Sequence, residues 1–351
     1  MIIQNYALRM SNAISWMRFP LILFVILLHC YSVNKINGDH HFYFQILYPF
    51  SLWLGETGVP GFFFISGYLF FLSHKTYRKK LSTRIQTLFI PYILWNGIIL
   101  GIYLLAFAFG YPQEIHGKLI SEFKLSDYIR IFWDRGHFDQ GNFVPLLCPL
   151  WYIRNLMIMC IISPLLFNFI RYGRELFLLS LVIWWLYSYH NAFIPQTFVF
   201  FSLGAYFSIH DINPLKFVTD NSHLFVSLFL LFACADISTH TIISCPYALQ
   251  LHRLSLSFNI PFLILIADWC ANKGYTSMIL TDSSFIVFCS HYPITIIMRK
   301  YISSKYSYLS DETHILLYFI CVIISTLFSL FVYYILIKYM PKIKKILSGN
   351  R

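Results

Sequence analysis

The chain is organised as long apolar runs separated by short polar segments. A membrane-spanning helix needs about 20 consecutive, mostly apolar residues. Runs near this length recur along the whole chain, although three of them are short. The expected spans are 14–33, 47–72, 86–110, 150–170, 175–190, 195–210, 223–242, 256–271, 283–299 and 314–339. The pattern predicts an all-α fold, a polytopic transmembrane bundle of about ten helices.

One polar segment, residues 110–149, is much longer than the others and carries several acidic and histidine side chains. Long loops in compact folds often act as lids or binding elements. The chain has no internal repeat, low-complexity tract or separate soluble part. We therefore expect residues 1–351 to form a single integral-membrane domain with one long non-cytoplasmic loop.

The amino-acid composition indicates that the chain is surrounded by lipid and not by water. Hydrophobic residues make up 58% and charged residues 12%, whereas soluble domains carry about 25% charged residues. The eight cysteines form no Cys-x-x-Cys pair and lie mostly in apolar runs, where cysteine behaves as a small hydrophobe. We expect no disulfide framework and no metal site.

The basic residues indicate a topology. Ten spans would put both termini on one side, together with the basic loop 73–85. That side would hold sixteen Lys and Arg residues and the other side nine, so the first should be cytoplasmic. The same bias accounts for the net charge of +11. The basic runs contain no nucleic-acid motif, so no nucleic-acid partner is expected.

Two ionisable residues lie in the first span, and such residues are costly in a membrane. Arg18 and His29 are eleven residues apart, which is close to three helical turns, so they share one face about 16 Å apart along the axis. A guanidinium can hold phosphate and an imidazole can accept a proton. A long donor such as a phosphopantetheine thioester could run between them. Alternatively, Arg18 is a topological anchor and His29 a core histidine.

The second span adds a carboxylate and leads into a basic loop. Glu56 could orient or deprotonate a group near His29, or be a solvated loop residue. The pair Ser66-Gly67 favours close helix packing. The loop that follows is the densest basic cluster on its side, and it could bind the phosphates of a nucleotide-bearing donor or lipid headgroups. Its candidate donor-binding residues are Arg78, Lys79, Lys80 and Arg84.

Polar residues in later spans are further candidates. Arg154 and Asn155 begin the fourth span beside the long loop, and His291 is a second histidine at membrane depth. Asp236 and Asp268 lie within apolar runs without an evident partner.

Together these motifs resemble the acyltransferase-3 family of bacterial membrane acyltransferases. The resemblance covers nearly the whole chain, and it rests on the order of its motifs. These are Arg18-x10-His29, Phe63-Phe64-Ile65-Ser66-Gly67-Tyr68-Leu69, the basic loop leading to Pro91-Tyr92, Leu150-Trp151-Tyr152-Ile153-Arg154, and His291-Tyr292-Pro293. One family motif, Arg-x-x-Arg on the third helix, is half present, with Arg84 at its first position and Thr87 at its second.

The resemblance implies about ten helices in the bacterial inner membrane and transfer of an acyl group, often acetyl from acetyl-CoA, to a hydroxyl of a cell-envelope glycan or lipid-linked sugar. Acyl-CoA would be a co-substrate, not a resident cofactor. The expected catalytic residues are His29 as general base with Arg18 and Glu56. The acceptor would meet Arg154, Asn155, Tyr68 and His291, with the first three as trial oxyanion donors. Membrane lipids surround the chain, and a homo-oligomer is left open.

Two other functions fit the same composition. A transporter or flippase for a lipid-linked saccharide would also carry buried polar residues, but such proteins often contain internal repeats. A membrane sensor or scaffold with a degenerate site is the other alternative, and the retained pair Arg18 and His29 argues mildly against it.

Overall fold

The fold was obtained as a computed structural model, which describes residues 2–31, 41–115, 118–134, 143–188, 193–243, 245–306 and 308–350. Nearly all of this part is helical. Its longer helices are α1 (Ile2–Cys30), α3 (Gly58–Leu72), α5 (Ile90–Ala108), α7 (Trp151–Ile161), α8 (Ser163–Tyr187), α9 (Phe193–Ile209), α11 (Ser222–Thr241), α12 (Ala248–Asn272), α13 (Met278–Lys305) and α14 (Asp311–Tyr339).

Shorter elements connect or extend these helices. They are α2 (His41–Tyr48), the π-helix η2 (Pro49–Leu54), α4 (Tyr77–Arg84), the π-helix η3 (Ile85–Phe89), β1 (Glu114–Ile115), β2 (Lys118–Leu119), the 3-10 helix η4 (Ile120–Glu122), α6 (Leu125–Arg130), the 3-10 helix η6 (Cys148–Leu150), α10 (Pro214–Asp220) and α15 (Pro341–Leu347). Within the described ranges every expected span is mostly helical, which confirms the all-α membrane bundle.

The count of about ten spans is not confirmed. Within the described ranges, five helices are long and apolar enough to cross a membrane, and a sixth crossing would be the pair α7 and α8. That pair bends by 70° at Ile162, where the span 150–170 was expected to be continuous. Ser163-Pro164 begins α8, and a proline there lacks the N–H that would continue α7. A second kink, at Arg174 with φ of 46°, divides α8 where a loop was expected.

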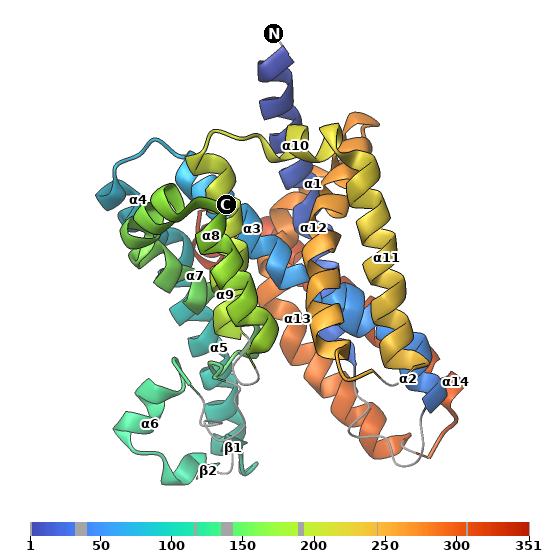
Figure 1. Cartoon of the computed structure of the whole chain (residues 1–351). Coiled ribbons are helices and arrows are strands. Elements are labelled where there is room, and N and C mark those ends of the chain that lie inside the picture. Colours follow the sequence, from blue (N-terminus) through green and yellow to red (C-terminus); the bar gives the residue numbers. More distant parts are fainter. Residues whose placement is uncertain are drawn as a thin grey trace.

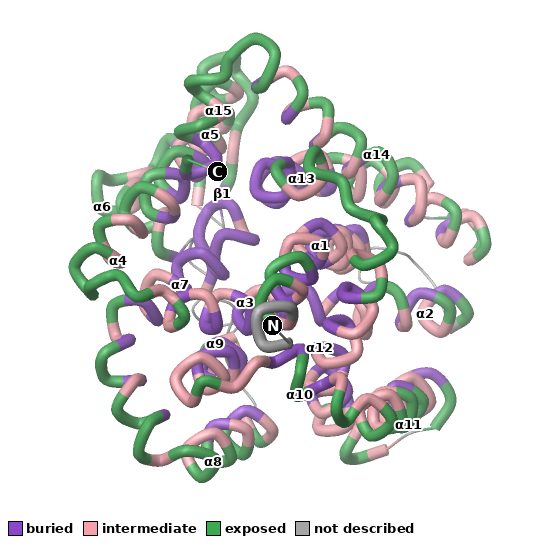
Figure 2. Tube along the Cα trace, turned by 90° about the horizontal axis from the view of Figure 1, so that it is seen from above, coloured by how far each residue is buried: buried purple, intermediate pink, exposed green. Residues whose placement is uncertain are grey.

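Helix α1 lies at the centre of the bundle (Figure 2). It packs against α3, α12 and α13, and its buried side chains form the middle of one continuous apolar core. By contrast, α8, α11 and α14 lie at the rim and expose large apolar side chains such as Leu176, Leu231 and Leu327. An apolar rim around a packed interior is what a lipid solvent requires.

Helices α3 and α9 make the closest contact in the bundle, and glycine makes it feasible. A Cβ added to Gly67 would lie 2.0 Å from the Phe201 carbonyl oxygen, and one added to Gly204 would lie 2.0 Å from that of Phe64. Only hydrogen fits at either position. The sequence interpretation of Ser66-Gly67 as a packing feature is confirmed at Gly67.

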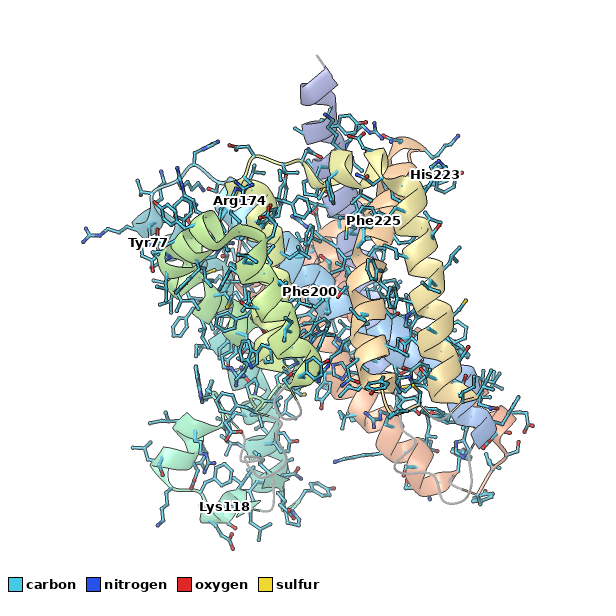
Figure 3. All side chains as sticks on the ribbon, in the orientation of Figure 1. Tyr77, Lys118, Arg174, Phe200, His223 and Phe225 are labelled. Carbon is cyan, nitrogen blue, oxygen red and sulfur yellow. The ribbon has the colours of Figure 1, made fainter. Side chains whose placement is uncertain are left out.

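The bundle has two distinct ends (Figures 1 and 3). The N-terminus, α4 and α10 lie at one end, here called the α4 end, with Tyr77, Arg174 and His223. The hairpin β1–β2 and α6 lie at the opposite end with Lys118. The C-terminal segment returns towards the α4 end, because Gly349 packs against the backbone of Thr87 in η3.

The expected long loop has its own small fold at the hairpin end. Ile115, Ile120, Ile131 and Leu146 form a separate apolar cluster that packs against α5. A hydrogen bond from Lys118, with another from the backbone N–H of Lys124, holds the pKa of Asp127 below its ordinary value. The loop is thus attached to the bundle along α5.

Candidate active site

A cavity of about 220 Å³ lies between α1, α3, α7, α13 and the junction of α4 with η3. We call it the central cavity. It contains three charged side chains, Arg18, Arg84 and Asp282. The other lining residues are Ile22, Phe62, Ile65, Ser66, Leu69, Leu88, Tyr152, Ile153, Leu156, Cys160, Thr281, Ser284, Phe285 and Phe288. A mostly apolar hollow with a few convergent polar groups is typical of a small-molecule site.

Arg18 and Arg84 reach the central cavity from different elements. Arg18 projects from α1 beneath the α4 end, and Arg84 ends α4, where its guanidinium carbon lies 5.7 Å from the Phe70 ring centre. Two cations against one carboxylate leave the cavity positively charged. An anionic part of a ligand would therefore be favoured there.

A second hollow of about 130 Å³ adjoins Arg84 on its outer side, and we call it the basic vestibule. It is lined by Phe70, Ser73, Lys75, Lys80, Thr83 and Arg84. The Lys80 ammonium lies 4.9 Å from the Phe70 ring centre, a cation–π contact that holds it in place. Because Arg84 lines both hollows, the basic residues extend without a break into the central cavity.

The expected donor residues do not share one location. Lys80 and Arg84 face the two hollows, whereas Arg78 and Lys79 are exposed on α4 and line neither of them. Thr87, at the position of the missing second arginine, is covered by the C-terminal segment around Gly349. The helical spacing explains the division, because residues four apart share a face of α4.

His29 lies beyond the central cavity and packs against α13. Its ring centre is 5.5 Å from that of His291 and 5.0 Å from that of Tyr292. The backbone carbonyl of His29 accepts a hydrogen bond of 3.0 Å from Arg299. Phe288 lines the cavity and its ring centre is 6.2 Å from that of His291. Phe288 therefore connects the cavity wall to His291, and neither histidine lines the cavity itself.

Glu56 belongs to a different group of polar residues. Its carboxylate lies 3.1 Å from Nε2 of His252, whose Nδ1 lies 2.9 Å from Asp236. Asp236 also accepts a hydrogen bond of 2.7 Å from the Tyr48 hydroxyl and lies 3.0 Å from His240. Both nitrogens of His252 face carboxylate oxygens, which a doubly protonated imidazole satisfies. The structure thus joins Glu56 to α11 and α12, whereas the sequence suggested a role near His29.

Three further residues that were expected to bind the acceptor, Arg154, Asn155 and Tyr68, do not line the central cavity. Arg154 is buried and donates hydrogen bonds of 2.7 Å and 3.0 Å to the carbonyls of Trp133 and Phe143. These contacts fasten the end of the long loop to α7. Asn155 donates to the Thr197 hydroxyl. Tyr68 is buried on α3, next to the glycine contact with α9.

Several cavity residues were not singled out from the sequence. Ser66 and Tyr152 place their hydroxyl oxygens 3.0 Å apart in the cavity wall. Asp282, near the start of α13, lines the same cavity. Ser66 and Tyr152 belong to motifs of the resemblance, but nothing in the sequence marked them as site residues, and Asp282 is only a polar residue near the start of an apolar run. Of the two unexplained aspartates, Asp236 pairs with His252 and Asp268 forms a bidentate ion pair with Arg9.

No metal site is evident in the part of the chain that the structure describes, because it contains no group of three or more His, Cys, Asp or Glu side chains arranged to hold a metal ion.

Comparison with known proteins agrees with the motifs. The family model described as an acyltransferase domain matches residues 11–334. The succinoglycan biosynthesis protein ExoH of Rhizobium meliloti (strain 1021) is 25% identical over 268 residues, which cover 70% of this chain and 68% of that protein. No solved structure matches the chain. The chain therefore belongs to the acyltransferase-3 family and is a membrane acyltransferase.

Proposed function

We propose that this protein transfers an acyl group, acetyl from acetyl-CoA, to a hydroxyl of a cell-envelope polysaccharide or lipid-linked sugar at the bacterial inner membrane. The observation that carries the proposal is the shared position of Arg84 in the basic vestibule and in the central cavity with Arg18. Acyl-CoA has phosphates at one end and a thioester at the other. The name of the relative ExoH refers to succinoglycan biosynthesis, which supports a polysaccharide acceptor.

The donor would bind with its phosphates at the basic vestibule and its thioester in the central cavity. Lys80 and Arg84 supply the charge at the vestibule, and a guanidinium suits bidentate phosphate binding. Arg18 lies further in and attracts the remaining negative charge. The apolar cavity wall then accommodates the pantetheine arm, with Phe288 at its deep side.

The chemistry proposed is direct transfer. His29 takes the proton of the acceptor hydroxyl, whose oxygen attacks the acyl carbon. The bond between carbon and sulfur breaks, and the departing thiolate receives the proton from His29. The hydroxyls of Tyr152 and Ser66 line the cavity and are the proposed donors to the oxyanion. This step requires the thioester and the acceptor hydroxyl to meet between the central cavity and His29.

In the proposed orientation the α4 end faces the cytoplasm, where acyl-CoA is made available, and both termini lie on that side. The acceptor would reach the histidines from a side of the bundle other than the α4 end. Membership of an acyltransferase family also favours an enzyme over the transporter alternative.

The test compares two charge reversals on α4. In Arg84→Glu the expected loss of acetyl-CoA affinity is about 10- to 100-fold, because charged hydrogen bonds to phosphate are replaced by repulsion. The matched control is Arg78→Glu, which changes an exposed arginine on the same helix that lines neither hollow. Calorimetry on protein purified in detergent measures both. Equal affinities in the two variants would show that Arg84 does not bind the donor.

A further inference from the structure

His291 carries a polar atom that the fold leaves without a partner. Its side chain is fully buried, and Nε2 makes no hydrogen bond within the described ranges of the chain. Buried polar atoms are almost always hydrogen-bonded, because their removal from water is otherwise uncompensated. An orphaned imidazole nitrogen beside an active site therefore points to a group that arrives with a ligand.

The other ring nitrogen determines what this atom can do. Nδ1 lies 3.1 Å from the Val287 carbonyl oxygen, one turn earlier in α13. A carbonyl oxygen only accepts hydrogen bonds, so Nδ1 carries the hydrogen. In the neutral ring Nε2 is then an acceptor with a bare lone pair. Its natural partner is an O–H or N–H group.

His291 lies close to the proposed base and to one residue of the cavity wall. Its ring centre is 5.5 Å from that of His29, the proposed base, and 6.2 Å from that of Phe288, which lines the central cavity. In the proposed mechanism His29 takes the proton of one hydroxyl, and Nε2 of His291 accepts a hydrogen bond from another. An acceptor molecule with two neighbouring hydroxyls supplies both groups.

We propose that Nε2 of His291 binds a second hydroxyl of the acceptor, next to the one that is acylated, so that the preferred acceptor is a sugar with a vicinal diol. The inference rests on the proposed function. The reacting hydroxyl gives its proton to His29, and the thiolate of CoA receives it. The neighbouring hydroxyl keeps its proton and only donates a hydrogen bond to His291. Its binding fixes which oxygen faces the acyl carbon.

The experiment is a double-mutant cycle. One partner is Nε2 of His291, removed by mutation, and the other is a single hydroxyl of the sugar, removed in the deoxy derivative. Its probes are acetyl-CoA with methyl glucoside and methyl galactoside, each compared with its monodeoxy derivatives. The wild-type protein is expected to prefer a diol over the matching deoxy sugar by about 10- to 100-fold in kcat/KM, because the deoxy sugar leaves Nε2 unpaired. His291→Asn keeps an amide N–H near the Nδ1 position for the Val287 carbonyl, but it has no group at Nε2.

In this variant the preference should vanish, since transfer to the diol falls to the rate for the deoxy sugar. Transfer to the deoxy sugar should stay as in the wild type, and it therefore reports on correct folding. His291→Gln, whose amide oxygen lies near the Nε2 position, should restore part of the preference.

Two results would overturn the inference. One is an equal loss on diol and deoxy sugars in His291→Asn, which a purely structural role predicts. The other is a wild-type protein that transfers to no diol, or to diols and deoxy sugars alike. Neither result bears on the affinity for acetyl-CoA, so the comparison of Arg84→Glu with Arg78→Glu tests the donor site separately.

Discussion

Arg18 and His29 share one face of α1, yet they meet different parts of the bundle. Arg18 lines the central cavity, whereas His29 packs against His291 and Tyr292 of α13. The sequence predicts their spacing of three turns, and the structure shows that this spacing separates a residue of the cavity from a residue packed against α13. Arg18 lines the central cavity, where a donor can bind, and His29 lies outside the lining of that cavity, against His291.

At this scale the prediction concerns the base. We expect His29→Gln to insert into the membrane normally but to lose acyl transfer, because removing a general base costs about 10²–10⁴-fold in rate. His291→Gln should lose less. Purified protein with radiolabelled acetyl-CoA and a glycan acceptor measures the rates. Near-normal transfer by His29→Gln would make His29 a packing residue and remove the mechanism.

The spacing of residues along the sequence indicated some of the spatial neighbours among the candidate residues and not others. Arg18 and His29 lie on one helix, so helical geometry alone links them. Glu56 and His252 are 196 residues apart, and no local rule relates two such positions. Asp282 joins Arg18 in the cavity only because α13 packs beside α1. Sequence periodicity shows which face of a helix is polar, but the neighbour of that face depends on the packing of the whole bundle.

Among the helices, α3 and α9 have the most demanding contact. Backbone meets backbone at Gly67 and Gly204, so the position of α3 is set without any adjustable side chain. Ser66 precedes Gly67 and lines the central cavity. The contact therefore fixes one wall of the cavity as well as the distance between two helices.

We predict that Gly67→Ala destabilises the protein by about 1–3 kcal/mol, because the new methyl group would overlap the Phe201 carbonyl and force the helices apart. Gly97→Ala is the matched control. Gly97 is also inside a helix, but an added Cβ meets nothing within 4 Å, so alanine should be neutral or stabilising by up to about 1 kcal/mol. Reversible unfolding in detergent distinguishes the two. Equal stabilities would show that the α3–α9 contact can relax.

The elements themselves were largely predictable, whereas their breaks were not. The described part of each apolar run is mostly helix, because a spanning backbone must satisfy its own hydrogen bonds. The break at Ile162 lies inside an expected continuous span. Ser163-Pro164 could have indicated it, but proline is also tolerated within helices here, at Pro20, Pro261 and Pro293. Whether a proline ends a helix or only bends it depends on the neighbours that satisfy the freed carbonyls.

Several basic segments of the molecule lie at one end. The N-terminus, α4 and the C-terminal segment near η3 lie at the α4 end, and the hairpin β1–β2 lies opposite (Figure 1). The basic vestibule opens at the α4 end as well, since it is formed by α4 and the end of α3. Topology and donor access are thus linked through the same set of lysines and arginines.

We therefore expect reporter fusions at the two termini to give the same, cytoplasmic signal, because the basic side of a membrane protein is retained inside. A reporter inserted in the hairpin β1–β2 should give the opposite signal. Fluorescent and periplasm-active reporters in intact cells measure the three positions. Termini on opposite sides would contradict the expected even number of spans.

The two π-helices have a consequence for reading any sequence of this kind. A π turn closes after five residues where an α turn closes after four, so each extra residue advances the helical phase by about 100°. In η3 the N–H of Ile90 bonds to the carbonyl of Ile85 in this way. A helical wheel drawn straight through residues 77–108 therefore puts Arg84 and α5 in the wrong relation. The same applies at η2, just before Glu56. The phase of such a wheel is therefore wrong close to Arg84 and Glu56. The faces of the helices must be assigned separately on the two sides of each π turn.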